Sequence, residues 1–150
     1  MTSNSKYYQG RFHPKNPEKY KGDVKNIIYR SSWELKFMRW CDTNEKVLEY
    51  SSEEFFIPYF DPTTKKVRRY FPDFLVKYIT KEGITKKAII EIKPLRETKE
   101  PVLSKNKQKK TILNETLTYV KNQAKWKAAE EFCKDNLMEF RLITENELGI

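Results

Sequence analysis

The order of helical and strand patterns along the chain predicts a domain of the α/β (α+β) class, in which helices flank a central mixed sheet. Two segments have apolar residues at the helical spacing, and the stretch between them alternates short apolar runs with turn residues. The resulting order is αβββαβ. At 150 residues the chain is long enough for one domain with a buried core. We expect this single domain at residues 27–150, preceded by an extended, basic N-terminal arm at residues 1–26.

The first helix is expected to begin near Ser31 or Ser32. Its apolar residues recur at i, i+4, i+7 and i+8, which is the helical period: Trp33, Phe37, Trp40 and Cys41. The polar run at residues 42–44 ends it.

Four short strands are expected next, at residues 46–50, 55–60, 67–78 and 86–93. Turn residues separate them at 61–64 and 81–83. Pro58 indicates an edge strand, and Pro72 interrupts the third strand, because proline has no N–H to donate to a neighbouring strand. The four strands are expected to form a β-meander.

A long helix is expected over residues 111–135, followed by a last strand at 139–144. One apolar stripe runs along the helix: Leu113, Leu117, Val120, Ala124, Ala128 and Phe132. Asn136 is expected at the first position beyond its C-terminal cap. In the last strand, Phe140 and Leu142 are expected to face the same side.

The charge balance favours a polyanionic partner. Thirty Lys and Arg against 21 Asp and Glu give a formal net charge of +9, and a field of that sign attracts nucleic acid by counterion release and steering. A soluble basic protein without a nucleic-acid role is the alternative.

The residue inventory excludes several function classes. His13, Cys41 and Cys133 are too few and too scattered for structural zinc, and the one histidine lies in a proline-flanked segment unsuited to a Ser–His triad. The two cysteines do not suggest a disulfide framework and are expected to be buried on helices, which suits a reducing compartment. No apolar run reaches the length of a membrane span, and no secretory signal is seen. We expect a cytoplasmic protein, or one packaged from the cytoplasm into a particle.

Asp73, Glu91 and Lys93 are the candidate catalytic group. Residues two apart in a strand share a face, so Glu91 and Lys93 project together while the apolar residues at 88, 90 and 92 face a core. Pro94 keeps Lys93 extended. If the strands are neighbours, Asp73 and Glu91 can bind one Mg²⁺, with the carbonyl of Ile92 and waters completing its octahedral shell. A surface pair of Glu91 with Lys93 is the alternative.

Such a metal would lower the pKa of a bound water and polarise a scissile phosphate, while Lys93 orients the water and neutralises growing charge. Glu34, in the first helix, is a third carboxylate that could bind the metal directly or through water. The alternative is a capping box, in which Ser31 and Glu34 satisfy backbone N–H groups of the first turn.

Basic and polar residues outside this group are candidate DNA contacts. Arg68 and Arg69 are possible phosphate clamps, and the lysine cluster of residues 105–110 is either a phosphate-contacting loop or a solvated linker. Gln123 and Lys125 could contact phosphate or help to position Lys93; a solvated polar face is the alternative. The lysines of the cluster are Lys105, Lys107, Lys109 and Lys110.

Glu34, Pro72-Asp73 and Glu91-x-Lys93 together resemble the PD-(D/E)xK nuclease superfamily. The surrounding stretches at 29–34, 57–59, 69–74, 90–94 and 140–145 resemble TnsA-like transposition endonucleases. From residue 8 onward the chain is similar to the family of nucleases that complete the heads of T-even-type tailed phages. These resemblances imply a restriction-endonuclease-like fold and catalytic roles for Glu34, Asp73, Glu91 and Lys93.

The resemblances also imply a function. It is endo- or exonucleolytic cleavage of double-stranded DNA with Mg²⁺, for which Mn²⁺ is expected to substitute, and without a nucleotide cofactor. The expected role is processing packaged DNA before head–tail joining, in the host cytoplasm or on the virion, with portal, neck or other head proteins as partners. Two alternatives stay open: a structural protein that binds a DNA end or the portal without catalysis, and a TnsA-like transposition or junction endonuclease.

Overall fold

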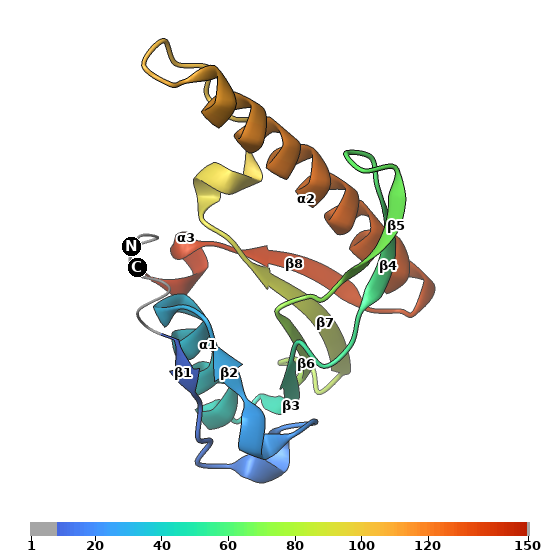
Figure 1. Ribbon diagram of the computed structural model, residues 1–150. Helices are drawn as coiled ribbons and strands as arrows, with labels where there is room; N and C mark the ends of the chain where they lie inside the picture. Colours follow the sequence, from blue (N-terminus) through green and yellow to red (C-terminus); the bar gives the residue numbers. More distant parts are fainter. Residues whose placement is uncertain (1–8, 150) are drawn as a thin grey trace.

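The computed structural model describes residues 9–149 and is built around a four-stranded mixed sheet in the order β3-β6-β7-β8 (Figure 1). β6 pairs antiparallel with both β3 and β7, and β8 runs parallel to β7. Helices α1 and α2 stand before and after the first three of these strands in the chain, so the predicted αβββαβ order and fold class are confirmed. The bounds are α1 Ser32–Thr43, β3 Val47–Ser52, β6 Phe74–Ile79, β7 Thr85–Ile92, α2 Lys109–Asp135 and β8 Glu139–Ile143.

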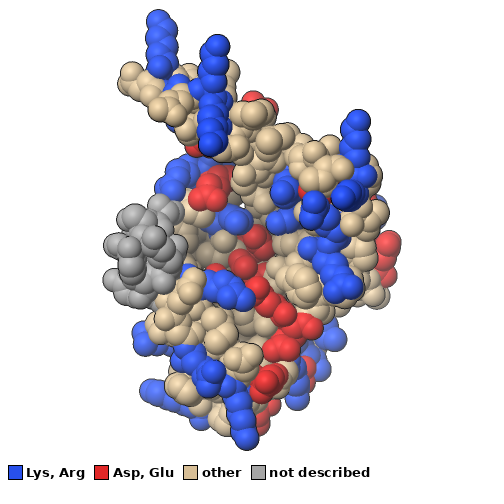
Figure 2. All heavy atoms as spheres, viewed as in Figure 1, with Lys and Arg blue, Asp and Glu red and all other residues tan. Residues whose placement is uncertain are grey.

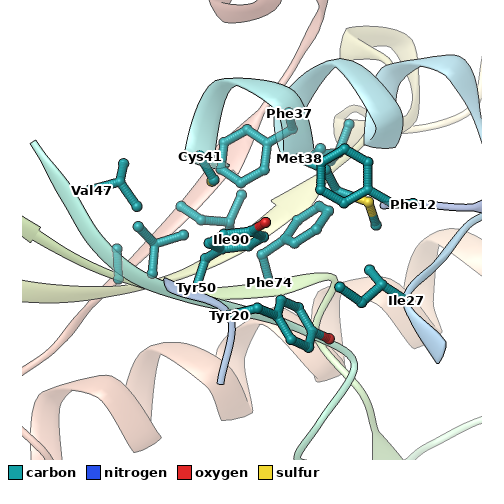
Figure 3. Packing of buried hydrophobic residues seen from close by; sticks show 13 residues of the cluster. Phe12, Tyr20, Ile27, Phe37, Met38, Cys41, Val47, Tyr50, Phe74 and Ile90 are labelled. Atoms are coloured by element: carbon teal, nitrogen blue, oxygen red, sulfur yellow. The ribbon is translucent and has the colours of Figure 1, made fainter. Parts of the chain in front are cut away.

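Both faces of the sheet are covered, which explains why β7 is buried on both sides. Ala88, Ile90 and Ile92 pack with Phe37 and Met38 of α1 (Figure 3). On the opposite face, a second cluster joins Ile89 to residues of α2, including Trp126 and Ala129. This alternation is the parity predicted for the strand. Cys41 and Cys133 are buried free thiols on α1 and α2, as expected.

Within the predicted strand region at 67–78 the interruption at Pro72 is confirmed, but the two parts belong to different sheets. β5 (Lys66–Tyr70) pairs with β4 (Ile57–Asp61) in a separate two-stranded hairpin, and β6 begins only after Pro72. Pro72 has no N–H with which to continue a ladder, so the chain changes sheet at this point. The expected meander therefore holds for β3, β6 and β7, and the β4–β5 hairpin is inserted between β3 and β6.

Residues 9–26, the described part of the predicted arm, pack against the domain. Phe12 and Tyr20 are buried in the core, while short elements form around them: β1 (Gly10–Arg11) paired with β2 (Ile28–Tyr29), and the 3-10 turns η2 (Pro17–Lys19) and η3 (Val24–Asn26). Asp42 of α1 accepts hydrogen bonds from the N–H groups of Lys15 (2.8 Å) and Asn16 (3.1 Å). The aromatic residues of this segment thus anchor it. The domain boundary at residue 26 stays a prediction.

Helix α2 begins two residues earlier than predicted, and only the C-terminal half of the predicted apolar stripe packs on the domain, where Ala124, Ala128 and Phe132 are partly buried. The residues buried against the domain are Asn122, Trp126, Ala129 and Cys133, all in the C-terminal half. Leu113, Leu117 and Val120 are exposed, and the N-terminal half projects from the domain (Figure 1). Asn136 is the C-cap itself, so the position beyond the cap belongs to Leu137, which has a positive φ of 56°.

The remaining elements are short: the 3-10 turn η4 (Leu95–Thr98) and α3 (Glu145–Leu148), which has a capping box at Thr144. Within residues 9–149, no helix is both long enough and apolar enough to cross a bilayer.

Candidate active site

The pairing of β6 with β7 brings Asp73 beside Glu91. Phe74 lies opposite Ile90 in the register, so the residue before β6 lies next to the residue after Ile90. Asp73 Oδ2 accepts a hydrogen bond of 2.8 Å from the main-chain N–H of Ile92. Because the N–H and C=O of one residue in an extended strand point to the same side, the carbonyl of Ile92 also faces Asp73.

Glu91 is a buried carboxylate, only 7% exposed. Its Oε1 accepts a 2.6 Å hydrogen bond from the hydroxyl of Tyr70, and its Oε2 lies 3.8 Å from Lys93 Nζ. A solvent-exposed pair of Glu91 with Lys93 is therefore excluded. Glu91 is thus a buried anion that a neutral donor and a nearby ammonium group stabilise.

Glu34 caps the first turn of α1 and lies near the other two carboxylates. The hydroxyl of Ser31 accepts from the N–H of Glu34 (3.1 Å), and Glu34 Oε1 accepts from the N–H of Arg30 (3.2 Å), one residue before the position that a capping box uses. Burial raises the pKa of Glu34, and the charges of Glu53 and Glu91 raise it further. Glu34 thus caps α1 and also lies within the electrostatic range of Glu91.

The three carboxylates repel one another. Burial raises the pKa of Asp73 well above its ordinary value, and the negative charges of Glu91 and Glu34 add to this rise. Burial also raises the pKa of Glu91, against the opposing effects of the Tyr70 hydroxyl and the Lys93 charge. A site that crowds negative charge in this way favours either a proton or a cation.

The donor set fits a hard divalent cation. Carboxylate oxygens of Asp73 and Glu91, the carbonyl of Ile92 and, through water, Glu34 would give an all-oxygen shell of the kind that Mg²⁺ and Mn²⁺ prefer. Within the described chain, no three His, Cys, Asp or Glu side chains are arranged to hold a metal by themselves. Water and main-chain oxygen would therefore complete the coordination.

Lys125 reaches the same place from α2. Its Nζ lies 5.7 Å from the ring centre of Tyr70 and 5.9 Å from that of Tyr59. Burial lowers the pKa of Lys125; the charge of Glu91 opposes this effect, and that of Lys93 adds to it. Its half-buried position over two rings contradicts the solvated-face alternative and places a second ammonium group close to Glu91.

The other candidate DNA contacts lie farther away. Gln123 is exposed and, two residues from Lys125, points to nearly the opposite side of α2. Lys109 is separated from Lys125 by about 24 Å along the helix, at 1.5 Å per residue. Of the lysine cluster, Lys107 is held by Glu115 (2.9 Å) and the carbonyl of Val102 (3.0 Å), and the exposed members are Lys105, Lys109 and Lys110.

Arg68 and Arg69 lie on the β4–β5 hairpin beside the site. Arg68 Nε lies 3.2 Å from the buried Asp61 carboxylate, and the Arg69 guanidinium lies 4.9 Å from the ring centre of Phe56. Figure 2 shows acidic residues as a band across the middle of a hollowed face, with Lys and Arg gathered over this hairpin and at the projecting end of α2. Positive charge thus borders the acidic site.

Tyr70 is the site residue that sequence reasoning did not identify. The stretch Arg69-Tyr70-Phe71-Pro72 carries part of the family resemblance, but no role was assigned to its tyrosine. The alternation of side chains along the strand could have indicated it, because Tyr70 points to the side opposite to its exposed neighbours Arg69 and Phe71.

Two comparisons with known proteins agree with this geometry. The family described as TnsA-like endonuclease N terminal matches residues 44–145, a span that includes Asp73, Glu91 and Lys93 but not Glu34. The head completion nuclease of Enterobacteria phage T4 is 40% identical over 144 residues, which are 94% of this chain and 93% of that protein. The predicted resemblance is confirmed, and the chain belongs to the TnsA-like endonuclease family of PD-(D/E)xK nucleases.

Proposed function

We propose that this chain is a Mg²⁺-dependent deoxyribonuclease that processes packaged DNA during phage head completion. As a member of an endonuclease family it is a nuclease. The observation that carries the finer proposal is the juxtaposition of Asp73 and Glu91, which come from neighbouring strands and have Lys93 beside them.

Each side chain has a role in hydrolysis of a phosphodiester. A bound divalent cation supplies Lewis acidity and a water of lowered pKa. Asp73, Glu91 and the Ile92 carbonyl would hold such a cation, and Glu34 would assist through water. Lys93 orients the attacking water, and Lys125 stabilises the negative charge that develops on the phosphate. The hydroxyl of Tyr70 fixes the orientation of Glu91.

The substrate is double-stranded DNA. Arg68 and Arg69 contact phosphates beside the site, and the exposed Lys105, Lys109 and Lys110 contact them farther along α2. Lys107 would contact phosphate only by giving up its ion pair with Glu115, and Gln123 makes at most a peripheral contact. The net charge of +9 supports this orientation of a polyanion across the site.

The catalytic proposal is tested by cleavage of linear and supercoiled DNA with Mg²⁺, Mn²⁺ or EDTA. We expect cutting with either metal, none with EDTA, and loss of about 10²-fold or more in Asp73→Asn and Glu91→Gln. Glu82→Gln, in the exposed turn between β6 and β7, is the matched control and should cut normally. Equal cutting by wild type and Asp73→Asn, or undiminished cutting in EDTA, contradicts the proposal.

The assembly role is carried over from the phage T4 relative, whose name is head completion nuclease. We place the protein in the host cytoplasm during assembly and on the filled head. The projecting half of α2 is the surface best suited to a portal or neck protein, because the exposed Leu113, Leu117 and Val120 lie in a row with lysines near them. A partner with an acidic rim around an apolar patch would complement it.

That projecting surface also favours a second candidate function, a structural head protein that does not need catalysis. Complementation of head–tail joining separates the two functions. If Glu91→Gln supports joining while the double charge reversal Lys109→Glu/Lys110→Glu abolishes it, the structural function holds; loss of joining in Glu91→Gln supports the nuclease function. Lys81→Glu, in the exposed β6–β7 turn, is the matched charge-reversal control.

A further inference from the structure

The outer face of the β4–β5 hairpin is a ladder of exposed apolar side chains. Phe60 pairs with Val67 in the register, and these residues are 57% and 71% exposed. Next along the ladder is the pair Pro58 and Arg69, followed by Phe56 and Phe71, whose ring centres lie 5.7 Å apart. Both phenylalanines of this last pair are also exposed.

The alternation of the two strands explains why the ladder faces solvent. Ile57 and Tyr59 of β4 and Tyr70 of β5 point inward and are buried in the cluster that α2 shares with the sheet. Residues between them must point outward. One face of the hairpin therefore packs on α2, and the other face carries aromatic side chains that are exposed to solvent.

Positive charge borders the ladder. Arg69 lies within it, and Lys65, Lys66 and Arg68 are also exposed on the hairpin, although strand parity places Lys66 and Arg68 on the inner side of β5 with Tyr70. The one acidic residue among positions 55–72 is Asp61, which is buried and paired with Arg68 and Lys121. A second copy of the chain or a basic protein would be repelled here, while a nucleic acid would be attracted.

One end of the ladder lies next to the catalytic group along the chain. Tyr70 donates to Glu91 from the inner side of β5, while its neighbours Arg69 and Phe71 belong to the outer side. Phe71 precedes Asp73 by two residues. DNA whose scissile phosphate lies at Asp73 and Glu91 would thus have its adjoining nucleotides at the hairpin.

We propose that this ladder is a stacking platform for unpaired bases, so that the preferred substrate is DNA with a single-stranded segment next to the duplex at the cut. Exposed phenylalanines with an arginine among them are the means by which proteins hold single-stranded bases without reading their sequence. This inference rests on the proposed nuclease function and adds the substrate class.

Equilibrium binding in EDTA tests the platform without cutting. The probes are a blunt duplex and the same duplex with a single-stranded tail that carries 2-aminopurine, whose fluorescence is quenched on stacking. We expect the wild type to bind the tailed DNA about tenfold more tightly and to quench its fluorescence. Phe60→Ala should lose most of that preference and the quenching, and Phe60→Trp should retain both.

Ile84→Ala, in the β6–β7 turn, is the matched control, because Ile84 is 56% exposed and lies away from the hairpin. Should Phe60→Ala fail to fold, as judged by circular dichroism, Val67→Ser on the same register pair takes its place. Equal wild-type binding of both probes, or an undiminished preference in Phe60→Ala, overturns the inference. Cleavage of the blunt duplex by the wild type with Mg²⁺ is measured separately, so that failure of the nuclease function is distinguished from failure of the platform.

Discussion

Substituting Tyr70 with phenylalanine removes a single hydroxyl from the candidate active site. The ring stays in the cluster with Ile89 and Trp126, so the substitution leaves packing intact. What is lost is the 2.6 Å hydrogen bond to Glu91 Oε1. Glu91 then keeps its ion pair with Lys93, whose Nζ lies 3.8 Å from Glu91 Oε2.

The expected losses in metal affinity and cleavage rate follow from the strength of the hydrogen bond between Tyr70 and Glu91. A hydrogen bond to a buried charged group contributes about 1.5–3 kcal/mol, and the partners that orient metal-binding carboxylates typically account for about 10- to 100-fold in metal affinity or rate. We therefore expect Tyr70→Phe to bind Mn²⁺ about tenfold more weakly and to cleave DNA about 10- to 100-fold more slowly at subsaturating metal.

Calorimetric titration with Mn²⁺, combined with cleavage rates over a range of Mg²⁺ concentrations, measures both effects. Tyr78→Phe is the matched control, since it also removes a hydrogen bond from tyrosine to glutamate, that between Tyr78 and Glu139 in the central sheet. The control should bind Mn²⁺ and cleave as the wild type does. If Tyr70→Phe stays within twofold of wild type in both measurements, Tyr70 does not orient a metal-binding Glu91.

Three further predictions concern Lys125, Asp73 and Lys19. Lys125→Met should slow cleavage about 10- to 100-fold by removing a cation next to Glu91, whereas Lys127→Met, on the exposed side of α2, should cut normally in the same assay. Without metal, in EDTA, the raised pKa of Asp73 means that the folded state binds this proton more tightly than the unfolded state does. The protonated carboxyl therefore stabilises the fold at low pH. That stabilisation is lost as the pH rises from about 4, the ordinary pKa of Asp in the unfolded chain, through the raised pKa of the folded state. Melting temperatures should therefore favour Asp73→Asn over wild type increasingly as pH rises, and a constant difference would contradict the crowding of charge. Lys19→Met should lower the free energy of unfolding, measured by urea denaturation, by about 1–3 kcal/mol. The reason is that Lys19 Nζ donates hydrogen bonds to three carbonyls at the end of α1. An unchanged urea midpoint would show that η2 does not stabilise that helix end.

Local rules predicted much of the site. Glu91 and Lys93 follow a strongly apolar run, and Pro94 keeps the chain extended, so strand parity alone placed both side chains on one face. The proximity of Asp73 needed one assumption, that neighbouring hairpin strands pair, and the register supports it.

Features that depend on packing between distant segments could not be predicted. The apolar stripe predicted for α2 packs on the domain only from Ala124 onward, and its N-terminal part, with Leu113 and Leu117, is exposed. The buried face, with Asn122 and Trp126, is selected by contact with the sheet and the hairpin. The contact of Tyr70 with Glu91 likewise depends on the hairpin leaving the main sheet at Pro72 and packing on α2. The opposite orientations of Gln123 and Lys125, by contrast, follow from the helical period and were available from the sequence.

Anomalous diffraction from Mn²⁺-soaked crystals tests most directly whether two acids on adjacent strands share one divalent cation. We expect a single strong peak within about 2.0–2.3 Å of a carboxylate oxygen of both Asp73 and Glu91, and its loss in Asp73→Asn. A peak elsewhere, or a wild-type site that binds no Mn²⁺ at saturating concentration, would contradict it.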